Sequence, residues 1–553
     1  MNADAAAAPA PSVSSAGKKA VLAIIFLGIL GGIQSADPNI NSTALLKAST
    51  ALGMGTTAAL AASISTLILA ATAITTGMMG HQLGGRRILV AALVLSAVGD
   101  LIVAAAPDTA FYLLGRAISG VGLGAVFGTS FAFVKAFATG KGGIGAALGT
   151  YMASSGLAAL LIVFTGSSLV GVDWRVAFLV VPTLSLLSIP VALALLPGKK
   201  DQLTQPVKKK TWDFGGQLLL ALAIITFLVG VSHAANSLTA PLTLGGVAAG
   251  IVFFLFFLLV EKNKGEDGFF PVRLFRDPIF IAAILCGLVY NLTYGATLLS
   301  FTNLFQYAND LSGIKLSSSQ LPFLIAGILG AILTGKLRGK GKLSRRGALL
   351  AGTIICVGGF VLFAITASSE PSTIWPYLPA LILTGIGITT SSIPYGGLII
   401  EKADPRHYGA VSSSRLTIGQ FWFALGLAGS TVIIDTITRS RIKEKFGTAG
   451  DTAIENFSVT GDKPSTPGLL KEATVAYGDA FAGMMIVLAV VTLIAGVASY
   501  LLIRKYGQGE EQDTLPPTPP SSGVTEEHTK AEHLESGPST PTPSPGQPNP
   551  AIG

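Results

Sequence analysis

Long apolar runs alternate with short segments that carry most of the charges, and this alternation continues along most of the 553-residue chain. A helix needs about 20 mostly apolar residues to cross a bilayer. Fourteen runs meet this requirement, so the pattern predicts fourteen transmembrane helices. They lie near residues 19–37, 52–79, 88–106, 110–134, 144–170, 174–196, 212–234, 240–261, 278–306, 317–337, 347–368, 374–400, 408–436 and 478–503.

The segments outside these runs predict how the chain is divided. Residues 1–17 are rich in Ala, Pro and Ser, and residues 506–553 are rich in Pro, Thr, Ser and Glu. Such compositions cannot bury enough apolar surface to fold, so both segments are expected to be disordered. The predicted membrane part consists of a six-helix half at 18–197, an inserted helix pair with its linkers at 198–277, and a second six-helix half at 278–505 that contains a long outer loop at 437–477. The stretch RIKEKFG at the start of this loop could be a short extension of the preceding helix.

Two connections between apolar runs repeat one pattern. The sequence GMMGHQLGGRR, Gly77–Arg87, follows the second run, and GKLRGKGKLSRR, Gly335–Arg346, follows the tenth. Both end in a pair of arginines that opens the next run. Internal repeats around a central binding site are typical of secondary transporters. The predicted fold is therefore an all-α membrane protein with a 6+2+6 arrangement and two pseudo-symmetric halves.

Composition and charge exclude a soluble protein and a nucleic-acid-binding protein. Hydrophobic residues make up 50% of the chain and charged residues 12%, whereas an average soluble domain is about 25% charged. The net charge of +8 comes from lysines and arginines gathered on one side of the predicted bundle; only Lys47, Arg175 and Lys315 fall in short connections on the other side. Positive residues remain in the cytoplasm. Both termini are therefore predicted to be cytoplasmic, with the basic belt facing anionic membrane lipid.

The sequence indicates neither a cofactor nor a metal. It has no Walker A motif, so ATP is not the expected energy source. Gly120, Gly122, Gly124 and Gly128 imitate a dinucleotide-binding fingerprint, but no strand precedes them, and close packing of helices explains them better. Cys286 and Cys356 both lie inside apolar runs and predict no disulfide framework.

Ionisable side chains inside apolar runs cost about 2.5–3.5 kcal/mol each on insertion scales and therefore mark functional positions. The candidates for coupling protons to a substrate are Asp37, Arg116, Asp100 and Asp435. Arg415 precedes Asp435 in the same run, and the sequence assigns it no role. An alternative for Asp37 is a solvated cap at the outer end of the first helix, just before Pro38.

Three stretches resemble motifs of the major facilitator superfamily. They are LLGRAISGVGLGAVFG (Leu113–Gly128), VDWRVAFLVVP (Val172–Pro182) and the loop GMMGHQLGGRR. The helix count, the 6+2+6 plan and Asp37 resemble the fourteen-helix drug:proton antiporter branch of that superfamily. The resemblance covers roughly residues 19–504. It implies transport by alternating access, with Asp37 and Arg116 sharing one site beside a central cavity.

The loop GMMGHQLGGRR departs from the family pattern in a way that concerns gating. His81 stands where the family has an aspartate that helps to latch the outward-facing state, and Gln82 stands at an arginine. We expect a tight turn in which the arginines contact helix C-termini or lipid phosphate; the alternative is that the loop only anchors the topology. The residues assigned to this inner gate loop are Gly77, His81, Gly84, Arg86 and Arg87.

The resemblance implies a monomeric, proton-coupled exporter of amphipathic or cationic small molecules in the cell membrane, and not an enzyme. Its partners would be the small-molecule substrate, protons and membrane lipids, without nucleic acid. Polar and aromatic residues expected to line the substrate cavity are Gln34, Asn39, Asn291, Tyr294, Asn303 and Trp422. One alternative is an exporter of a native lipid or cell-envelope component. Another is a membrane scaffold or sensor that acts through the C-terminal tail.

Overall fold

The structure is a computed structural model, and its described residues all belong to one compact unit. The residues that it describes are helical or in short connections, without a strand. They are 13–54, 57–138, 143–198, 213–234, 237–268, 270–305, 318–367, 374–401, 407–460 and 465–506.

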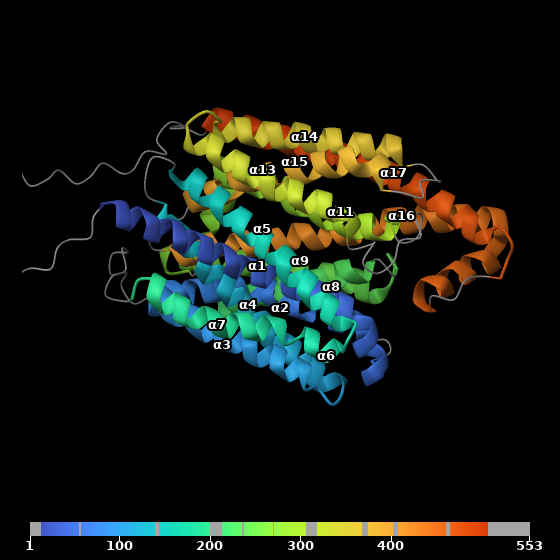
Figure 1. The fold of residues 1–553 in the computed structure, drawn as a ribbon, viewed down its shortest axis with the longest axis horizontal. Coiled ribbons are helices and arrows are strands. Elements are labelled where there is room, and N and C mark those ends of the chain that lie inside the picture. Colours follow the sequence, from blue (N-terminus) through green and yellow to red (C-terminus); the bar gives the residue numbers. More distant parts are fainter. Residues whose placement is uncertain are drawn as a thin grey trace, which may run out of the picture. The chain divides into compact units, whose positions relative to one another are not determined.

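The helices form one bundle, in which helices distant in the sequence, such as those of the first and fifth spans, lie side by side (Figure 1). The first six spans are α1 (Val13–Leu52), α2 (Ala58–Leu83), α3 (Gly85–Ala104), α4 (Thr109–Phe137), α5 (Gly143–Val170) and the pair α6 (Trp174–Ala177) and α7 (Val180–Leu195). The next two are α8 (Phe214–Ala234) and α9 (Pro241–Lys264), followed by the short turns η3 (Gly265–Asp267) and η4 (Val272–Arg276). The last six spans are α10 (Pro278–Gly287) with the π-helical turn η5 (Leu288–Leu292) and α11 (Thr293–Asn303), then α13 (Leu321–Gly339), α14 (Arg345–Thr366), η7 (Trp375–Tyr377) with α15 (Leu378–Glu401), α16 (Tyr408–Thr460) and α17 (Leu469–Tyr506).

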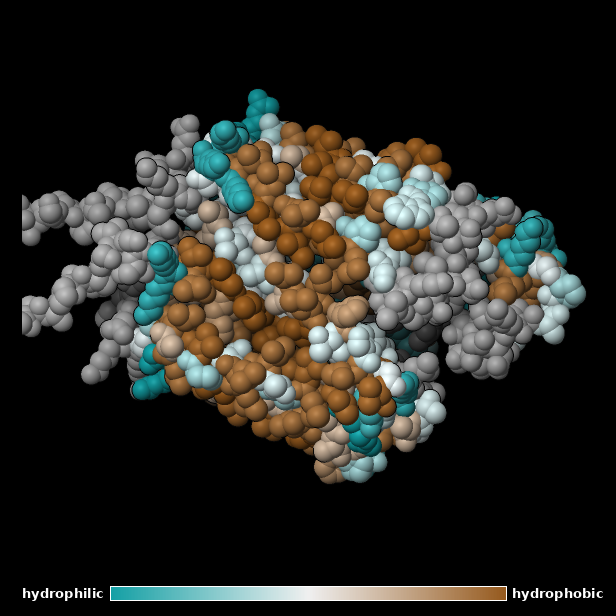
Figure 2. Space-filling model, viewed as in Figure 1, coloured by the Kyte–Doolittle hydropathy of each residue, from teal (hydrophilic) through white to brown (hydrophobic). Residues whose placement is uncertain are grey.

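Fourteen of these helical segments are long and apolar enough to cross a membrane, which confirms the predicted number of spans. Their outward surface is the reverse of a soluble protein's, because large hydrophobic side chains such as Leu161, Leu187 and Ile494 are more than half exposed. Figure 2 shows hydrophobic residues covering the middle of the bundle and hydrophilic residues gathered toward its ends. The chain is therefore a multi-pass membrane protein.

Several helices are longer than the hydrophobic runs that predicted them. α1 already begins at Val13, within the segment expected to be disordered, and continues through Pro38 to Leu52. α16 continues to Thr460 with one non-helical residue, Gly447, so the segment expected as a long outer loop is helical over most of its described length. Residues 507–553 lie outside the described residues.

Ion pairs explain how the polar parts of α16 and α17 remain helical beyond the membrane-length runs. Arg439 contacts Asp451 at 2.7 Å between Nε and Oδ1, and Lys445 contacts Glu472 at 2.6 Å between Nζ and Oε2. A small cluster formed by Ile442, Leu469 and Ala473 is buried there. The extension therefore has local packing of its own, which the hydrophobic pattern along the chain does not reveal.

The two repeated connections lie at one end of the bundle, where α3 and α14 begin and α4 and α17 end. We call it the basic end because these helix ends carry Arg86, Arg345, Lys135 and Lys505. Gly84 separates α2 from α3 with a φ of 109°, a backbone conformation that favours glycine. Arg86 Nη1 donates to the carbonyl oxygens of Leu193 and Leu196 at the end of α7, at 3.3 and 3.1 Å. The expected tight turn, with an arginine on a helix C-terminus, is present.

Close contacts join the two six-helix halves at the basic end. A Cβ on Gly77 of α2 would lie 2.6 Å from the carbonyl oxygen of Gly409 in α16, and a Cβ on Gly149 of α5 would lie 2.5 Å from Cα of Gly335 in α13. The backbones of facing helices therefore nearly touch at both places. Ser413 Oγ of α16 also donates to the carbonyl oxygen of Gly128 in α4 at 3.3 Å.

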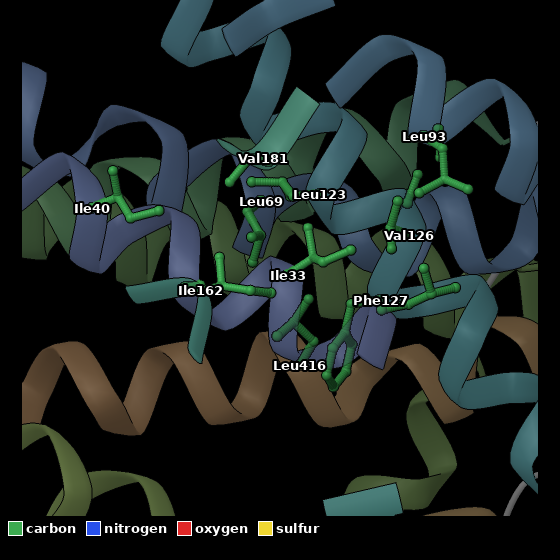
Figure 3. Close-up of a cluster of buried hydrophobic side chains, with 14 of the residues drawn as sticks. Ile33, Ile40, Leu69, Leu93, Leu123, Val126, Phe127, Ile162, Val181 and Leu416 are labelled. Carbon is green, nitrogen blue, oxygen red and sulfur yellow. The ribbon is translucent and has the colours of Figure 1, made fainter. Parts of the chain in front are cut away.

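The core of the first half also includes side chains from the second half. Its buried cluster draws on α1, α2, α4 and α5, and it includes Leu416 of α16. Figure 3 shows Leu416 beside Phe127, close to Ile33 and Leu69. The inserted helix α8 packs against both α2 and α16, so the inserted pair contacts both halves.

Candidate functional site

Three of the four predicted coupling residues form one buried ionic cluster. Arg116 of α4 binds both carboxylate oxygens of Asp37 in α1, with Nη1–Oδ1 and Nη2–Oδ2 distances of 2.8 Å. The same Nη1 lies 3.5 Å from Oδ1 of Asp100 in α3. All three side chains are at most 1% exposed. We call Asp37, Asp100 and Arg116 the buried triad.

The position of Asp37 differs from the alternative of a solvated cap at a helix end. α1 continues for 15 residues beyond Asp37, about 22 Å of helix. Asp37 is therefore inside a long helix, and its buried carboxylate is paired with Arg116. Asp37 Oδ2 also accepts a hydrogen bond from Ser65 Oγ of α2 at 3.5 Å.

Small residues bring the helices of the buried triad together. A Cβ on Gly99 of α3 would lie 2.3 Å from the backbone nitrogen of Ser119 in α4, and a Cβ on Gly115 would lie 2.7 Å from the carbonyl oxygen of Gly99. Gly99 and Gly115 are the sequence neighbours of Asp100 and Arg116. The close approach of α3 and α4 thus places a carboxylate beside a guanidinium in the membrane-spanning part of the bundle.

A second polar layer surrounds the buried triad. Tyr112, one turn before Arg116, donates its hydroxyl to Asn41 Oδ1 at 2.5 Å, and Asn41 Nδ2 donates to the carbonyl oxygen of Ala61 at 3.1 Å. The Arg116 guanidinium lies 5.7 Å from the ring centre of Phe178, a cation–π distance. These contacts fix α1, α2 and α4 around the arginine and limit its movement.

The buried triad is not fully paired in this arrangement. Two carboxylates surround one guanidinium, so the cluster carries one excess negative charge when both carboxylates are ionised. Within the described residues, Asp100 Oδ2 and Arg116 Nε have no hydrogen-bond partner although both atoms are buried. A buried excess charge is unfavourable, and one bound proton on a carboxylate would remove it. Asp100 is the more weakly held of the two carboxylates.

The other predicted site residues lie apart from these contacts. Asp435 is exposed on α16. Of the expected cavity residues, Gln34 is buried in α1, and Asn39 Nδ2 donates to the carbonyl oxygen of Ser35 at 2.8 Å within the same helix. Trp422 Nε1 donates to the carbonyl oxygen of Ile284 at 3.1 Å.

The expected cavity residues of the ninth span lie in and beside the π-helical turn η5. Asn291 Nδ2 donates to the carbonyl oxygen of Gly287 at 3.0 Å. Tyr294 stacks with Tyr290 and with Phe323, at ring-centre distances of 6.3 and 6.0 Å. The side chain of Asn303 lies outside the described residues. Single π-helical turns are frequently found at functional sites.

The inner gate loop lies against the second half. The imidazole of His81 is 6.4 Å from the ring centre of Tyr408, the first residue of α16, and Gly77 faces Gly409. Arg87 is exposed at the start of α3. The loop is therefore placed where it can influence the contact between the halves, although His81 replaces the aspartate expected by resemblance.

Sequence reasoning assigned no role to Arg415, which the structure places at the interface of the two halves. Its guanidinium lies over the rings of Phe131 at 4.6 Å, Tyr395 at 5.2 Å and Phe127 at 5.7 Å. The side chain is 5% exposed. The sequence signal that could have identified Arg415 is its charge inside an apolar run.

One family model matches the sequence over most of its helical part. The model described as "Major Facilitator Superfamily" matches residues 22–427. The chain belongs to the Major Facilitator Superfamily. Membership in this superfamily confirms the predicted resemblance and identifies the chain as a transporter rather than an enzyme.

Relatives of this Major Facilitator Superfamily transporter include proteins named for drug resistance. It is 24% identical over 437 residues to the "Multidrug resistance protein B homolog" of Mycobacterium tuberculosis (strain CDC 1551 / Oshkosh), covering 75% of this chain and 78% of that protein. It is 25% identical over 358 residues to the "Puromycin resistance protein pur8" of Streptomyces alboniger, covering 64% of this chain and 69% of that protein.

A solved structure shares the fold of this Major Facilitator Superfamily chain. The proton:xylose symporter XylE, solved with bound 6-bromo-6-deoxy-D-glucose, has a TM-score of 0.53 and 12% sequence identity, with 89% of this chain and 96% of the symporter covered. At this identity the likeness concerns the fold alone.

Proposed function

We propose that this transporter exports amphipathic small molecules in exchange for protons, with the buried triad as the proton-coupling site. The observation that carries the proposal is the ratio of two buried carboxylates to one guanidinium, at distances of 2.8 and 3.5 Å. An ionic cluster with an excess charge inside a membrane protein has a strong electrostatic preference for its protonated form or for a partner charge. Proton binding and the conformation of the halves can therefore influence one another.

The geometry favours different roles for the two carboxylates. Asp37 makes two short hydrogen bonds to Arg116 and fixes the guanidinium in a bidentate arrangement. Asp100 makes one longer contact, and its Oδ2 has no partner within the described residues. We assign the transported proton to Asp100 and a positioning role to Asp37. One charge moved through the membrane potential supplies about 2.3 kcal/mol per 100 mV.

Export, rather than uptake, is supported by the names of the relatives. Two of the matched proteins are called multidrug resistance and puromycin resistance proteins, and a third, from Aspergillus sp. (strain MF297-2), is called an efflux pump. These names belong to the relatives and motivate the direction assigned here. We place the protein in the cell membrane with both termini and the basic end in the cytoplasm, because basic residues remain on that side.

The test is transport of a panel of amphipathic fluorescent dyes with cationic, neutral and anionic head groups. In inside-out membrane vesicles with an acidic interior, wild-type protein should accumulate at least one dye, and a protonophore should abolish the accumulation. Asp100→Asn should remain inserted and folded but lose the response to the pH gradient. Because the panel covers three charge classes, this test does not depend on the charge of the substrate.

The matched control is the same substitution at an exposed carboxylate. Asp435→Asn should transport as the wild type does, since Asp435 lies exposed on α16. Transport by the wild type that is indifferent to the protonophore, or full pH-driven transport by Asp100→Asn, would refute the coupling proposal.

A further inference from the structure

Arg415 is a buried cation for which the described residues provide no carboxylate partner. The ion pairs among them join other basic residues: Arg116, Lys264, Arg345, Arg439, Arg441 and Lys445. A guanidinium has five N–H donors. The hydrogen bond that Arg415 makes through its guanidinium is from Nη2 to Met152 Sδ at 3.8 Å, and sulfur is a weak acceptor. Its buried Nε has no partner within the described residues.

We propose that Arg415 binds the anionic group of the transported molecule, so that the substrates are amphipathic acids. This proposal rests on the proposed function and narrows its substrate class from amphipathic small molecules to those that carry a carboxylate, sulfonate or phosphate group.

The surroundings of Arg415 suit an amphipathic ligand. Phe127 and Phe131 of α4 and Tyr395 of α15 present their rings to the guanidinium. The Tyr395 hydroxyl also donates to the backbone carbonyl of Arg415 at 2.6 Å, which fixes the ring beside the arginine. The rings stabilise a positive charge through their faces, but they cannot accept the in-plane N–H groups. An anion would fill that unmet hydrogen-bonding capacity, and aromatic carbon would contact the apolar body attached to it.

Arg415 also lies between the two halves of the transporter. Its partners come from α4 and α5 of the first half and from α15 of the second half, while Arg415 itself belongs to α16. It lies seven residues, about 10 Å, along α16 from Tyr408 at the basic end. Substrate sites of secondary transporters lie between the repeats, because both halves must release the ligand as they move.

Arg415 and Arg116 also differ in how their positive charges are balanced. Arg116 is neutralised by Asp37 at 2.8 Å and has a second carboxylate, that of Asp100, at 3.5 Å. Arg415 has the rings of Phe127, Phe131 and Tyr395 as its neighbours instead. Within the described residues, the transporter thus holds an excess negative charge among its first-half helices and, between its halves, a positive charge without a carboxylate partner. The first suits a proton and the second suits an anion.

The experiment measures binding with no gradient across a membrane. Purified full-length protein in nanodiscs of phosphatidylcholine is titrated with the fluorescent acid dansyl-leucine and with its neutral amide. These probes share one apolar body and differ in charge. Wild-type protein should bind the acid at least about tenfold more tightly than the amide, a difference of about 1.4 kcal/mol. Arg415→Gln should remove this preference while leaving the amide affinity within about twofold, and Arg415→Lys should retain part of it.

A matched control and a second measurement keep the result interpretable. Arg175→Gln removes an arginine that also stacks on an aromatic ring, at 4.4 Å from Trp174, and it should keep the preference for the acid. If Arg415→Gln does not unfold cooperatively, its binding data are set aside. The preference for the acid is then judged from Arg415→Lys, and from whether the acid raises the thermal unfolding midpoint of the wild-type protein more than the amide does. Equal binding of acid and amide by the wild type, or an undiminished preference in Arg415→Gln, would overturn the proposal and leave Arg415 as a structural cation–π contact.

The source of the anion is distinguished by changing the lipid. If phosphatidylglycerol added to the nanodiscs weakens dansyl-leucine binding competitively in the wild type but not in Arg415→Gln, the site takes lipid head groups as well as free acids. Unchanged binding assigns it to free acids. Because no proton gradient is present, loss of pH-driven export would not affect these measurements, and absence of acid binding would not affect proton coupling.

Discussion

At the scale of single residues, the two carboxylates of the buried triad differ in how firmly they are held. Asp37 makes two hydrogen bonds of 2.8 Å to Arg116, and Asp100 makes one of 3.5 Å. Removing one partner of a buried ion pair costs about 3–5 kcal/mol, because the other charge is left without compensation. The cost should therefore depend on which carboxylate is removed.

Asp37→Asn should destabilise the protein more than Asp100→Asn. With Asn at position 37, the guanidinium of Arg116 retains the distant carboxylate of Asp100 alone, whereas Asn at position 100 removes the excess negative charge and leaves the bidentate pair intact. Thermal unfolding in detergent, followed by fluorescence, should show a clearly lower midpoint for Asp37→Asn and a midpoint near that of the wild type for Asp100→Asn. Equal midpoints would contradict the separate roles assigned to the two carboxylates.

At the scale of helices, the contact between α3 and α4 determines whether the buried triad can form. The two backbones approach so closely at Gly99 and Gly115 that a single Cβ meets backbone atoms. The triad depends on this contact because Asp100 and Arg116 sit on the adjoining positions. The repeated glycines of α4 are therefore a packing requirement of the site.

Gly115→Ala should separate α3 from α4 and destabilise the protein. The added Cβ would lie 2.7 Å from the carbonyl oxygen of Gly99, and overpacking of this kind costs about 1–3 kcal/mol. Gly358→Ala is the matched control, because nothing lies within 4 Å of its added Cβ and alanine favours the helix. Thermal unfolding of both variants should show a loss for Gly115→Ala and no loss for the control. Similar midpoints would mean that the helices adjust without strain.

At the scale of the whole molecule, the contacts between the halves at the basic end determine on which side the transporter is closed. α2 meets α16 at Gly77 and Gly409, and α5 meets α13 at Gly149 and Gly335. With the basic end in the cytoplasm, as we propose, this arrangement is closed toward the cytoplasm. Opening on that side would require both pairs of helices to separate.

Gly77→Ala should shift the population toward the state that is open at the basic end. Its Cβ would lie 1.7 Å from Ser413 Oγ and 2.6 Å from the carbonyl oxygen of Gly409, so the closed contact cannot form unchanged. A cysteine placed at the buried Thr417, with Cys286 and Cys356 replaced, should react faster with a thiol reagent in this variant. Gly483→Ala, with no atom near its added Cβ, should leave the rate unchanged. Equal rates would show that the contact does not limit opening.

The arrangement of the fourteen spans also makes a topological prediction. Reporter fusions after Gly198 and after Gly265 should report the cytoplasm, because both positions follow an even-numbered span from a cytoplasmic N-terminus. A reporter at Gly450, in the extension of α16, should report the outside. A reversed result at any one of these three positions would contradict the proposed orientation.

The sequence by itself determined the number of spans, the superfamily and the tight turn at Gly84. Hydrophobic runs must satisfy their backbone hydrogen bonds as helices within a membrane, so run length alone predicts the elements. The same reasoning ended α1 near Asp37 and expected a loop at 437–477, because hydropathy falls where ion pairs and local packing maintain a helix. Tertiary structure decided that Asp37 and Asp100 share Arg116, and that Arg415 lies among aromatic rings from both halves. Pairing between helices depends on their rotation and approach, which single-chain periodicity does not specify.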